Sequence, residues 1–138
     1  MKRIFKIALM FFFLVPAETA FQENDQPEDI NKQVISAISA GSASDLEKYF
    51  NSMIDLTVGN NEDTYSKNQA GRIIKDFFDH KPVRSFKVSK QGTSNDGSQY
   101  TVGELLAGSK VFRVFYLIKK TGNIYFIQQF QIQEQQNN

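Results

Sequence analysis

The sequence contains no cysteine, no tryptophan and a single histidine in 138 residues. Without cysteine the chain can form no disulfide, no thiolate nucleophile, no cysteine-ligated zinc or iron–sulfur centre and no lipidated N-terminal cysteine. One imidazole cannot build a histidine-rich metal site. An excess of either charge is also missing, since 16 Lys and Arg stand against 15 Asp and Glu, and this balance argues against bulk nucleic-acid binding. We therefore expect no metal, no cofactor and no nucleic-acid partner.

The N-terminal segment has the pattern of an export signal. Lys2, Arg3 and Lys6 make a basic start, and an uninterrupted apolar run follows from Ile7 to Val15. A basic start and a short apolar core, followed by small residues, are typical of a secretory signal peptide. A membrane anchor needs about 20 apolar residues, roughly twice this run. The pattern predicts a signal peptide over residues 1–20.

The expected cleavage site has two alternatives. Cleavage after Ala17 puts Val15 and Ala17 at the two small-residue positions, whereas cleavage after Ala20 puts Glu18 at the first of them. Residues 1–20 hold three basic side chains and one acidic side chain, so the remainder carries a net charge of −1. We expect a periplasmic or extracellular protein with no membrane span once the signal is removed.

The remaining chain reads as helices followed by strands, with one strand between the second and third helix. Apolar residues at helical spacing predict a first helix that stops at Gly41, and a capping box over 44–47 predicts a second. Alternation predicts a strand over 54–58. A capping box from Ser66 to Gln69 opens a third helix. The expected apolar positions are Ile30, Val34, Ala37 and Ile38 in the first helix, Leu46, Tyr49, Phe50 and Met53 in the second, and Ala70, Ile73, Ile74, Phe77 and Phe78 in the third.

Beyond the third helix the pattern is that of strands joined by short turns. Apolar alternation or apolar runs predict strands near 86–89, 100–106, 111–118 and 124–132. Strands joined by such short turns must be antiparallel. We therefore expect an α+β domain over residues 21–133, in the order α-α-β-α-β-β-β-β, with its helices in the concave face of a curved antiparallel sheet. Residues 134–138 are expected to form a frayed polar tail.

This order of elements resembles the nuclear transport factor 2-like cone of the cystatin-like superfamily. Within this order, segments 46–50, 76–78, 100–105, 112–114 and 119–122 carry a narrower resemblance. On these segments the chain resembles domain of unknown function 4783, an extracytoplasmic family of Bacteroidota. The resemblance covers residues 28–133 and implies a cone that often encloses a pocket. It implies no activity, because the same fold hosts enzymes, binding modules and assembly domains.

A pocket in such a cone would be lined by aromatic side chains with polar tips. The tyrosines can equally be ordinary core residues, and that role is the commoner one for large aromatic side chains. If the cone holds a pocket and is not filled, the candidate ligand-binding residues are Tyr49, Tyr65, Phe77, Tyr100, Glu104 and Phe112.

Three titratable residues could carry chemistry. Glu104 shares strand phase with Tyr100, Val102 and Leu106, so it is either a carboxylate among apolar walls or, if Gly103 marks a bulge, an ordinary surface residue. Asp55 lies on the side of its strand opposite to the apolar residues. His80 is expected to close the third helix, where the helix dipole favours a cation. A role for His80 as a base would need it to face a pocket with a carboxylate behind it.

The strand over 111–118 has only one polar residue, Arg113. An antiparallel sheet with one covered face should alternate apolar and polar residues, so both faces of this strand call for cover. Helices cover one face. The other face is covered either by long neighbouring side chains or by a second copy of the chain, a partner protein or a segment distant in sequence, and of these we expect a second copy. The expected contact residues of a homodimer are Arg113, Phe115 and Leu117.

Taken together, these patterns predict an exported, non-enzymatic domain of the cell envelope. It would bind a small apolar ligand or a peptide, or interact with another protein. The alternative is an isomerase-like or hydrolase-like enzyme with Glu104 or Asp55 as a pocket carboxylate.

Overall fold

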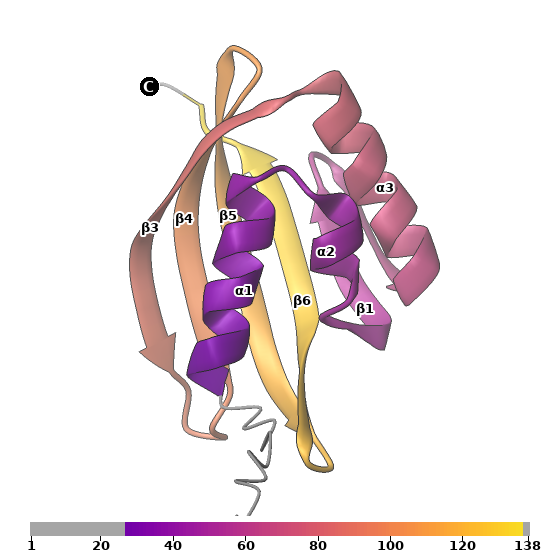
Figure 1. Ribbon diagram of the computed structural model, residues 1–138, viewed down its shortest axis with the longest axis vertical. Coiled ribbons are helices and arrows are strands. Elements are labelled where there is room, and N and C mark those ends of the chain that lie inside the picture. The colour runs from indigo at the N-terminus through magenta and orange to yellow at the C-terminus, as the bar shows by residue number, and fades with distance from the viewer. Residues whose placement is uncertain (1–26, 137–138) are drawn as a thin grey trace, which may run out of the picture.

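In the computed structural model, which describes residues 27–136, the helices lie on one side of a curved six-stranded sheet (Figure 1). The expected signal peptide and both cleavage sites lie outside the described residues. The predicted α+β class, with helices against a curved sheet, is confirmed. The helices are α1 (Pro27–Ser39), α2 (Ala43–Glu47) and α3 (Lys67–His80), and the strands are β1 (Phe50–Val58), β2 (Asn61–Ser66), β3 (Val83–Thr93), β4 (Gln99–Ala107), β5 (Lys110–Thr121) and β6 (Ile124–Glu134).

The sheet has the strand order β2-β1-β6-β5-β4-β3. Strands β3 to β6 form the predicted antiparallel meander, because their turns are too short for any other pairing. Strand β1 pairs with β6 in parallel, with Leu56 opposite Phe130. The last strand of the sequence therefore lies inside the sheet, between the first strand and the meander.

Helices α1 and α3 bury the apolar faces that their sequence spacing predicts. All four expected residues of α1 are buried, and in α3 only Ile73 remains half-exposed. Ser66 caps α3 as predicted, with its Oγ accepting a hydrogen bond from the Gln69 backbone N–H at 3.3 Å. Helix α1 lies against β3, and helix α3 lies against β1 and β2. The buried core includes Tyr116, Phe50 and Phe130.

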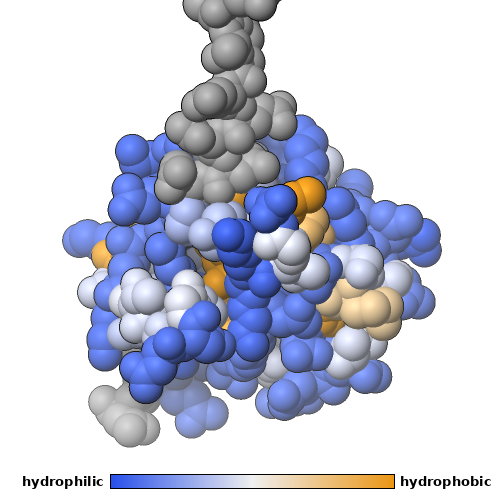
Figure 2. All heavy atoms as spheres, turned by 90° about the horizontal axis from the view of Figure 1, so that it is seen from below, coloured by the Kyte–Doolittle hydropathy of each residue, from blue (hydrophilic) through white to orange (hydrophobic). Residues whose placement is uncertain are grey.

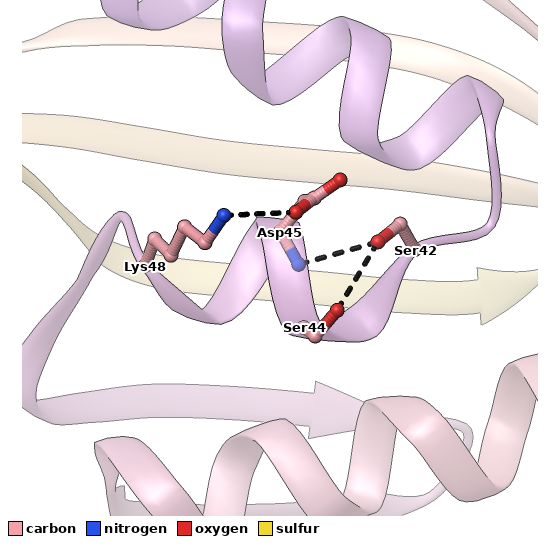
Figure 3. A network of polar contacts seen from close by, with 4 residues as sticks. All are labelled: Ser42, Ser44, Asp45 and Lys48. Atoms are coloured by element: carbon pink, nitrogen blue, oxygen red, sulfur yellow. Dashed lines mark hydrogen bonds and ion pairs between the residues drawn. The ribbon is translucent and has the colours of Figure 1, made fainter.

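Helix α2 is shorter than predicted and begins two residues earlier. Its N-cap is Ser42, not Ser44: the Ser42 Oγ accepts from the Asp45 N–H at 3.2 Å (Figure 3). The Ser42 N–H also donates to the Ala37 carbonyl at 2.9 Å, so one residue closes α1 and opens α2. The predicted apolar stripe of α2 is wrong beyond Leu46, because the helix ends at Glu47 and β1 begins at Phe50, where pairing with β6 outweighs the helical spacing.

The polar surface of α2 is held by a short ion pair. The Lys48 ammonium lies 3.0 Å from the Asp45 carboxylate, and both side chains are exposed (Figure 3). The hydrogen bond from Lys48, followed by that with Ser42, lowers the pKa of Asp45 below its ordinary value. Water screens an exposed pair of this kind, so it orients the helix end and adds little to stability.

Strand β2 is absent from the sequence prediction. Its residues Asn61–Ser66 are polar and mostly exposed, so no alternation marks them as a strand. They pair with β1 from Val58 opposite Asn61 to Met53 opposite Ser66. Gly59, at a φ of 62°, starts the reversal that lets the chain fold back. The backbone ladder forms this edge strand without an apolar face of its own.

The expected phase of β4 is also wrong. Tyr100, Val102 and Leu106 are half-buried on the outer face, and Thr101, Leu105 and Ala107 face the core. The sequence misleads here because the inner face also includes Gly103, which has no side chain. The Phe86 ring fills this space, since a Cβ on Gly103 would lie 2.5 Å from it.

Strand β5 is apolar on both faces in sequence, but in the structure its residues alternate between buried and partly exposed positions. Phe112, Val114, Tyr116 and Ile118 are buried, whereas Phe115 and Leu117 are half-exposed on the side away from the helices. Strand β6 continues to Glu134, one residue past the expected end of the domain. Within residues 27–136 there is no helix of the length and apolar character that crossing a membrane requires.

Candidate functional site

A hollow opens between the C-terminal half of α3 and the hairpin of β1 and β2. Its volume is about 440 Å³. We call it the α3 hollow. It is lined by Leu56, Val58, Asn61, Tyr65, Ile73, Asp76, Phe77, His80 and Lys81.

The floor of the α3 hollow is apolar and anchored in the core. Phe77 is 9% exposed, and its ring meets that of Phe112 edge-on, with the centroids 5.0 Å apart. Leu56 is buried beside it on β1. The Lys81 ammonium lies 5.3 Å from the centroid of the Phe77 ring, a cation–π contact. The apolar floor therefore carries one cation at its edge.

The rim of the α3 hollow carries the only histidine. His80 is the last residue of α3, as predicted, and its Nδ1 lies 2.8 Å from the Asp76 backbone carbonyl. The same Nδ1 lies 3.4 Å from the Asp76 carboxylate. Both side chains are largely exposed, at 71% and 76%. The structure thus places a carboxylate beside an imidazole at the mouth of a hollow, an arrangement that the four-residue spacing on one helix could have indicated.

The structure brings together three of the six expected ligand-binding residues. Tyr65 and Phe77 line the α3 hollow, and Phe112 supports Phe77 from behind. Tyr49 lies in a separate, smaller depression beside α1 and α2. The Tyr100 side chain lies over Gly92 on β3, and both residues border a second hollow, beside α1. The remaining residue, Glu104, lies elsewhere as well.

The two carboxylates with an expected chemical role lie outside the α3 hollow. Glu104 is exposed on the outer face of β4, where Lys87 and Arg113 are its register partners on β3 and β5. Asp55 is exposed on β1, and its Oδ1 accepts a hydrogen bond from the Thr64 hydroxyl at 2.7 Å. Of the two alternatives for Glu104, the surface position is the one observed.

Sequence reasoning missed a polar cluster inside the cone. The Tyr116 hydroxyl and the Thr101 hydroxyl both donate to Oδ1 of Asn31, on α1, the latter at 3.3 Å. Tyr116 is fully buried, and burial raises its pKa to about 12. The signal available in the sequence was a polar residue beside Ile30 at the start of an amphipathic helix. No motif connected it to strands 70 and 85 residues further along the chain.

Comparison with known proteins identifies the family. The model of the family described as domain of unknown function (DUF4783) matches residues 31–133. The chain belongs to the DUF4783 family. A DUF4783 protein from Bacteroides uniformis has 30% sequence identity and a TM-score of 0.73, over 78% of this chain and 99% of that one. A second, from Bacteroides ovatus, has 30% identity and a TM-score of 0.71, over 76% and 94%. No curated protein matches the sequence.

More distant structures share the fold alone. A domain of unknown function with a cystatin-like fold from Nostoc punctiforme has 12% identity and a TM-score of 0.62, over 79% of this chain and 75% of that one. An NTF2-like protein of unknown function from Silicibacter pomeroyi has 13% identity and a TM-score of 0.58, over 79% and 92%. These likenesses confirm that this chain has the cone fold expected from the resemblance, and they attach no activity to it.

Proposed function

We propose that this protein is an exported, non-enzymatic domain of the cell envelope that binds a small apolar ligand in the α3 hollow. The observation that carries the proposal is the hollow itself, with its apolar floor and its polar groups gathered at the rim. Its volume of about 440 Å³ falls within the range of small-molecule sites, which are mainly apolar with a few polar groups that fix orientation. The proposal of export rests on the signal pattern of residues 1–20.

The rim favours a ligand with one anionic end. Lys81 supplies a cation over the Phe77 ring. The Asp76 carboxylate lies beside His80 on the same rim, so Lys81 is the group that an anionic end of the ligand would contact. An apolar body against Leu56 and Ile73 would leave an anionic group at this edge, in reach of water. The proposed ligand is therefore a small, mainly apolar molecule that carries one anionic group at its end.

An enzyme is the second candidate, and one observation favours it. His80 and Asp76 adjoin at the mouth of the hollow, as an acid–base pair would. Both are about three-quarters exposed, however, so water competes for the same hydrogen bonds and screens their charges. Binding is therefore proposed ahead of catalysis.

A blocking substitution tests the binding proposal. Ile73→Trp extends a ring from α3 into the hollow without emptying the core, because Ile73 is half-exposed. With anilinonaphthalene sulfonate as the probe, we expect saturable binding to the natural protein and affinity about tenfold weaker in this variant, the loss of one well-placed apolar contact. Fluorescence titration, with amide NMR shifts to locate the probe, measures both quantities.

The matched control is Ile124→Trp, which adds the same ring at a residue that is 47% exposed in the β5–β6 hairpin. This control should bind the probe as the natural protein does. Equal affinity in the Ile73 variant, or NMR shifts outside α3, β1 and β2, would contradict a ligand site at the α3 hollow.

We further propose a homodimer through the outer face of the sheet. Phe115 and Leu117 are half-exposed there, on the side that the helices leave open (Figure 1). Beside them runs a row of register partners, Lys87, Glu104 and Arg113. In a two-fold arrangement the carboxylate of one copy would meet the cations of the other, so the same patch can be its own complement.

Phe115→Arg should abolish this dimer, because it places a cation in the centre of the apolar patch. Sedimentation or light scattering at high micromolar concentration should then show a dimer for the natural protein and a monomer for the variant. Ile124→Glu, a charge at an exposed hairpin position, serves as the control and should remain dimeric. A monomeric natural protein at that concentration would exclude the dimer.

A further inference from the structure

A second hollow lies on the other side of the cone, between the N-terminal half of α1 and the β3–β4 hairpin. Its volume is about 450 Å³. We call it the α1 hollow, and it shares no residue with the α3 hollow. It is lined by Glu28, Asn31, Lys32, Ile35, Gln91, Gly92, Thr93, Gln99, Tyr100 and Thr101.

Hydrogen bonds from the core fix the orientation of the Asn31 side chain in the α1 hollow. Two hydroxyls, those of Tyr116 and Thr101, donate to Oδ1 of Asn31. The amide oxygen and nitrogen lie on different sides of the same carbon atom. When the oxygen accepts two hydrogen bonds from the core, the Nδ2 group is therefore directed away from those two hydroxyls. Because Asn31 lines the hollow, we infer that its two N–H donors face that side.

The two hydroxyl groups that orient Asn31 are held in fixed positions. Tyr116 and Thr101 are register partners on β5 and β4, and they are 0% and 2% exposed. Their rotamers are set by packing and not by solvent. The Asn31 amide is therefore an oriented donor in place before any ligand arrives, which lowers the entropic cost of forming a hydrogen bond with one.

The rest of the lining is polar and nearly neutral. Gln91 is the register partner of Thr101, and Thr93 is that of Gln99, so their side chains lie on the same face as Asn31's partners. These amides and hydroxyls can each donate and accept. Glu28 and Lys32 carry opposite charges. The end of the molecule at which α1 begins is mostly hydrophilic where its described surface is visible (Figure 2).

We propose that the α1 hollow binds a neutral small molecule through a secondary amide group. The amide carbonyl accepts from Nδ2 of Asn31, and the amide N–H donates to a side-chain oxygen of Gln91 or Thr93. The apolar substituent, such as the methyl of an acetamide, packs against Ile35, the aliphatic side chain of the lining. An N-acetylated sugar and a short peptide both present this group, and the experiment separates the two sources.

The test is an amide NMR titration of the purified protein with three probes: N-acetylglucosamine, N-acetylglycinamide and glucose. The first two carry a secondary amide and the third does not. We expect saturable shifts in α1, β3 and β4 with at least one amide-bearing probe, and affinity for glucose at least about tenfold weaker. The probe that binds more tightly identifies the source of the amide. Binding of neither amide probe, or of glucose as tightly as the better of them, would overturn the proposal.

Asn31→Asp is the decisive variant. Its carboxylate still accepts from both hydroxyls, so the core contacts remain, while the Nδ2 donor becomes an oxygen that repels the ligand carbonyl. We expect affinity for the amide probe to fall about tenfold or more. Unchanged affinity would overturn the assignment of Asn31. Ile73→Trp, which blocks only the α3 hollow, is the control, and it should leave amide binding intact whatever it does to apolar binding.

Discussion

Phe130→Ala is expected to destabilise the protein by about 3–5 kcal/mol, the usual cost of emptying a buried phenylalanine site. Phe130 lies on β6 in the interior of the sheet and is 0% exposed. Its ring is 6.0 Å from that of Phe50 and stacks at 6.1 Å on Tyr116. These two neighbours belong to different strands, β1 and β5, so they cannot close together to fill the void. Since a domain is stable by only about 5–15 kcal/mol, urea unfolding should show a large shift in midpoint.

The control lies on the same strand. Phe126 is half-buried, so Phe126→Ala removes the same ring from a place where solvent can take its space. We expect it to cost about 1–2 kcal/mol. If the two variants lost the same free energy of unfolding, the burial of Phe130 would not explain its contribution to stability.

Tyr116→Phe is expected to change the response of stability to alkaline pH. Because burial raises the pKa of Tyr116 to about 12 and an exposed tyrosine titrates near 10, the unfolded chain loses this proton first. The neutral hydroxyl therefore stabilises the fold fully below about pH 10, and this contribution falls as the pH rises from about 10 to about 12. Two pKa units correspond to about 2–3 kcal/mol.

The comparison between the two proteins isolates this effect from other titrating groups. At neutral pH the variant should be less stable by about 1 kcal/mol, because it lacks the hydrogen bond to Asn31. Near pH 12 the order should reverse, since only the natural protein carries the buried hydroxyl. Urea unfolding of both proteins across this range measures the difference. A difference that stays constant with pH would show that the Tyr116 hydroxyl is not desolvated.

The elements with strong local signals could be predicted from the sequence. Helix α3 has a capping serine, an apolar face at i, i+3, i+4 and i+7, and a terminal histidine, and its observed bounds agree with them. The meander of β3 to β6 follows from turns too short for a crossover. In both cases neighbours along the chain determine the outcome.

Elements that depend on distant partners could not be predicted in the same way. Strand β2 has no apolar face, and its backbone pairing with β1 is what makes it a strand. Phe50 fits the spacing of a helix, yet pairing with Ile127 on β6 places it at the start of β1. The phase of β4 depends on Phe86, which covers Gly103 from the neighbouring strand.

The candidate site residues show the same difference between local sequence signals and contacts with distant residues. Tyr65, Phe77 and Phe112 were accessible to sequence reasoning because aromatic residues on α3 and the strands must meet inside a cone. Asn31 was not, because its significance depends on two hydroxyls from β4 and β5. A polar side chain on a helix becomes a candidate only when its partners in the core are known.

The parallel pairing of β1 with β6 also determines when the protein can fold. Strand β6 lies between the β1–β2 hairpin and strands β3 to β5, all of which precede it in the sequence. The β1–β2 hairpin therefore cannot pair with the rest of the sheet until residues 124–134 are present. Contacts between strands so far apart in sequence form late and slowly. Until the C-terminal strand is synthesised, the apolar faces of β1, β5 and α3 therefore remain incompletely covered. A chain that lacked β6 would also lose the strand that joins β1 to β5 in the sheet.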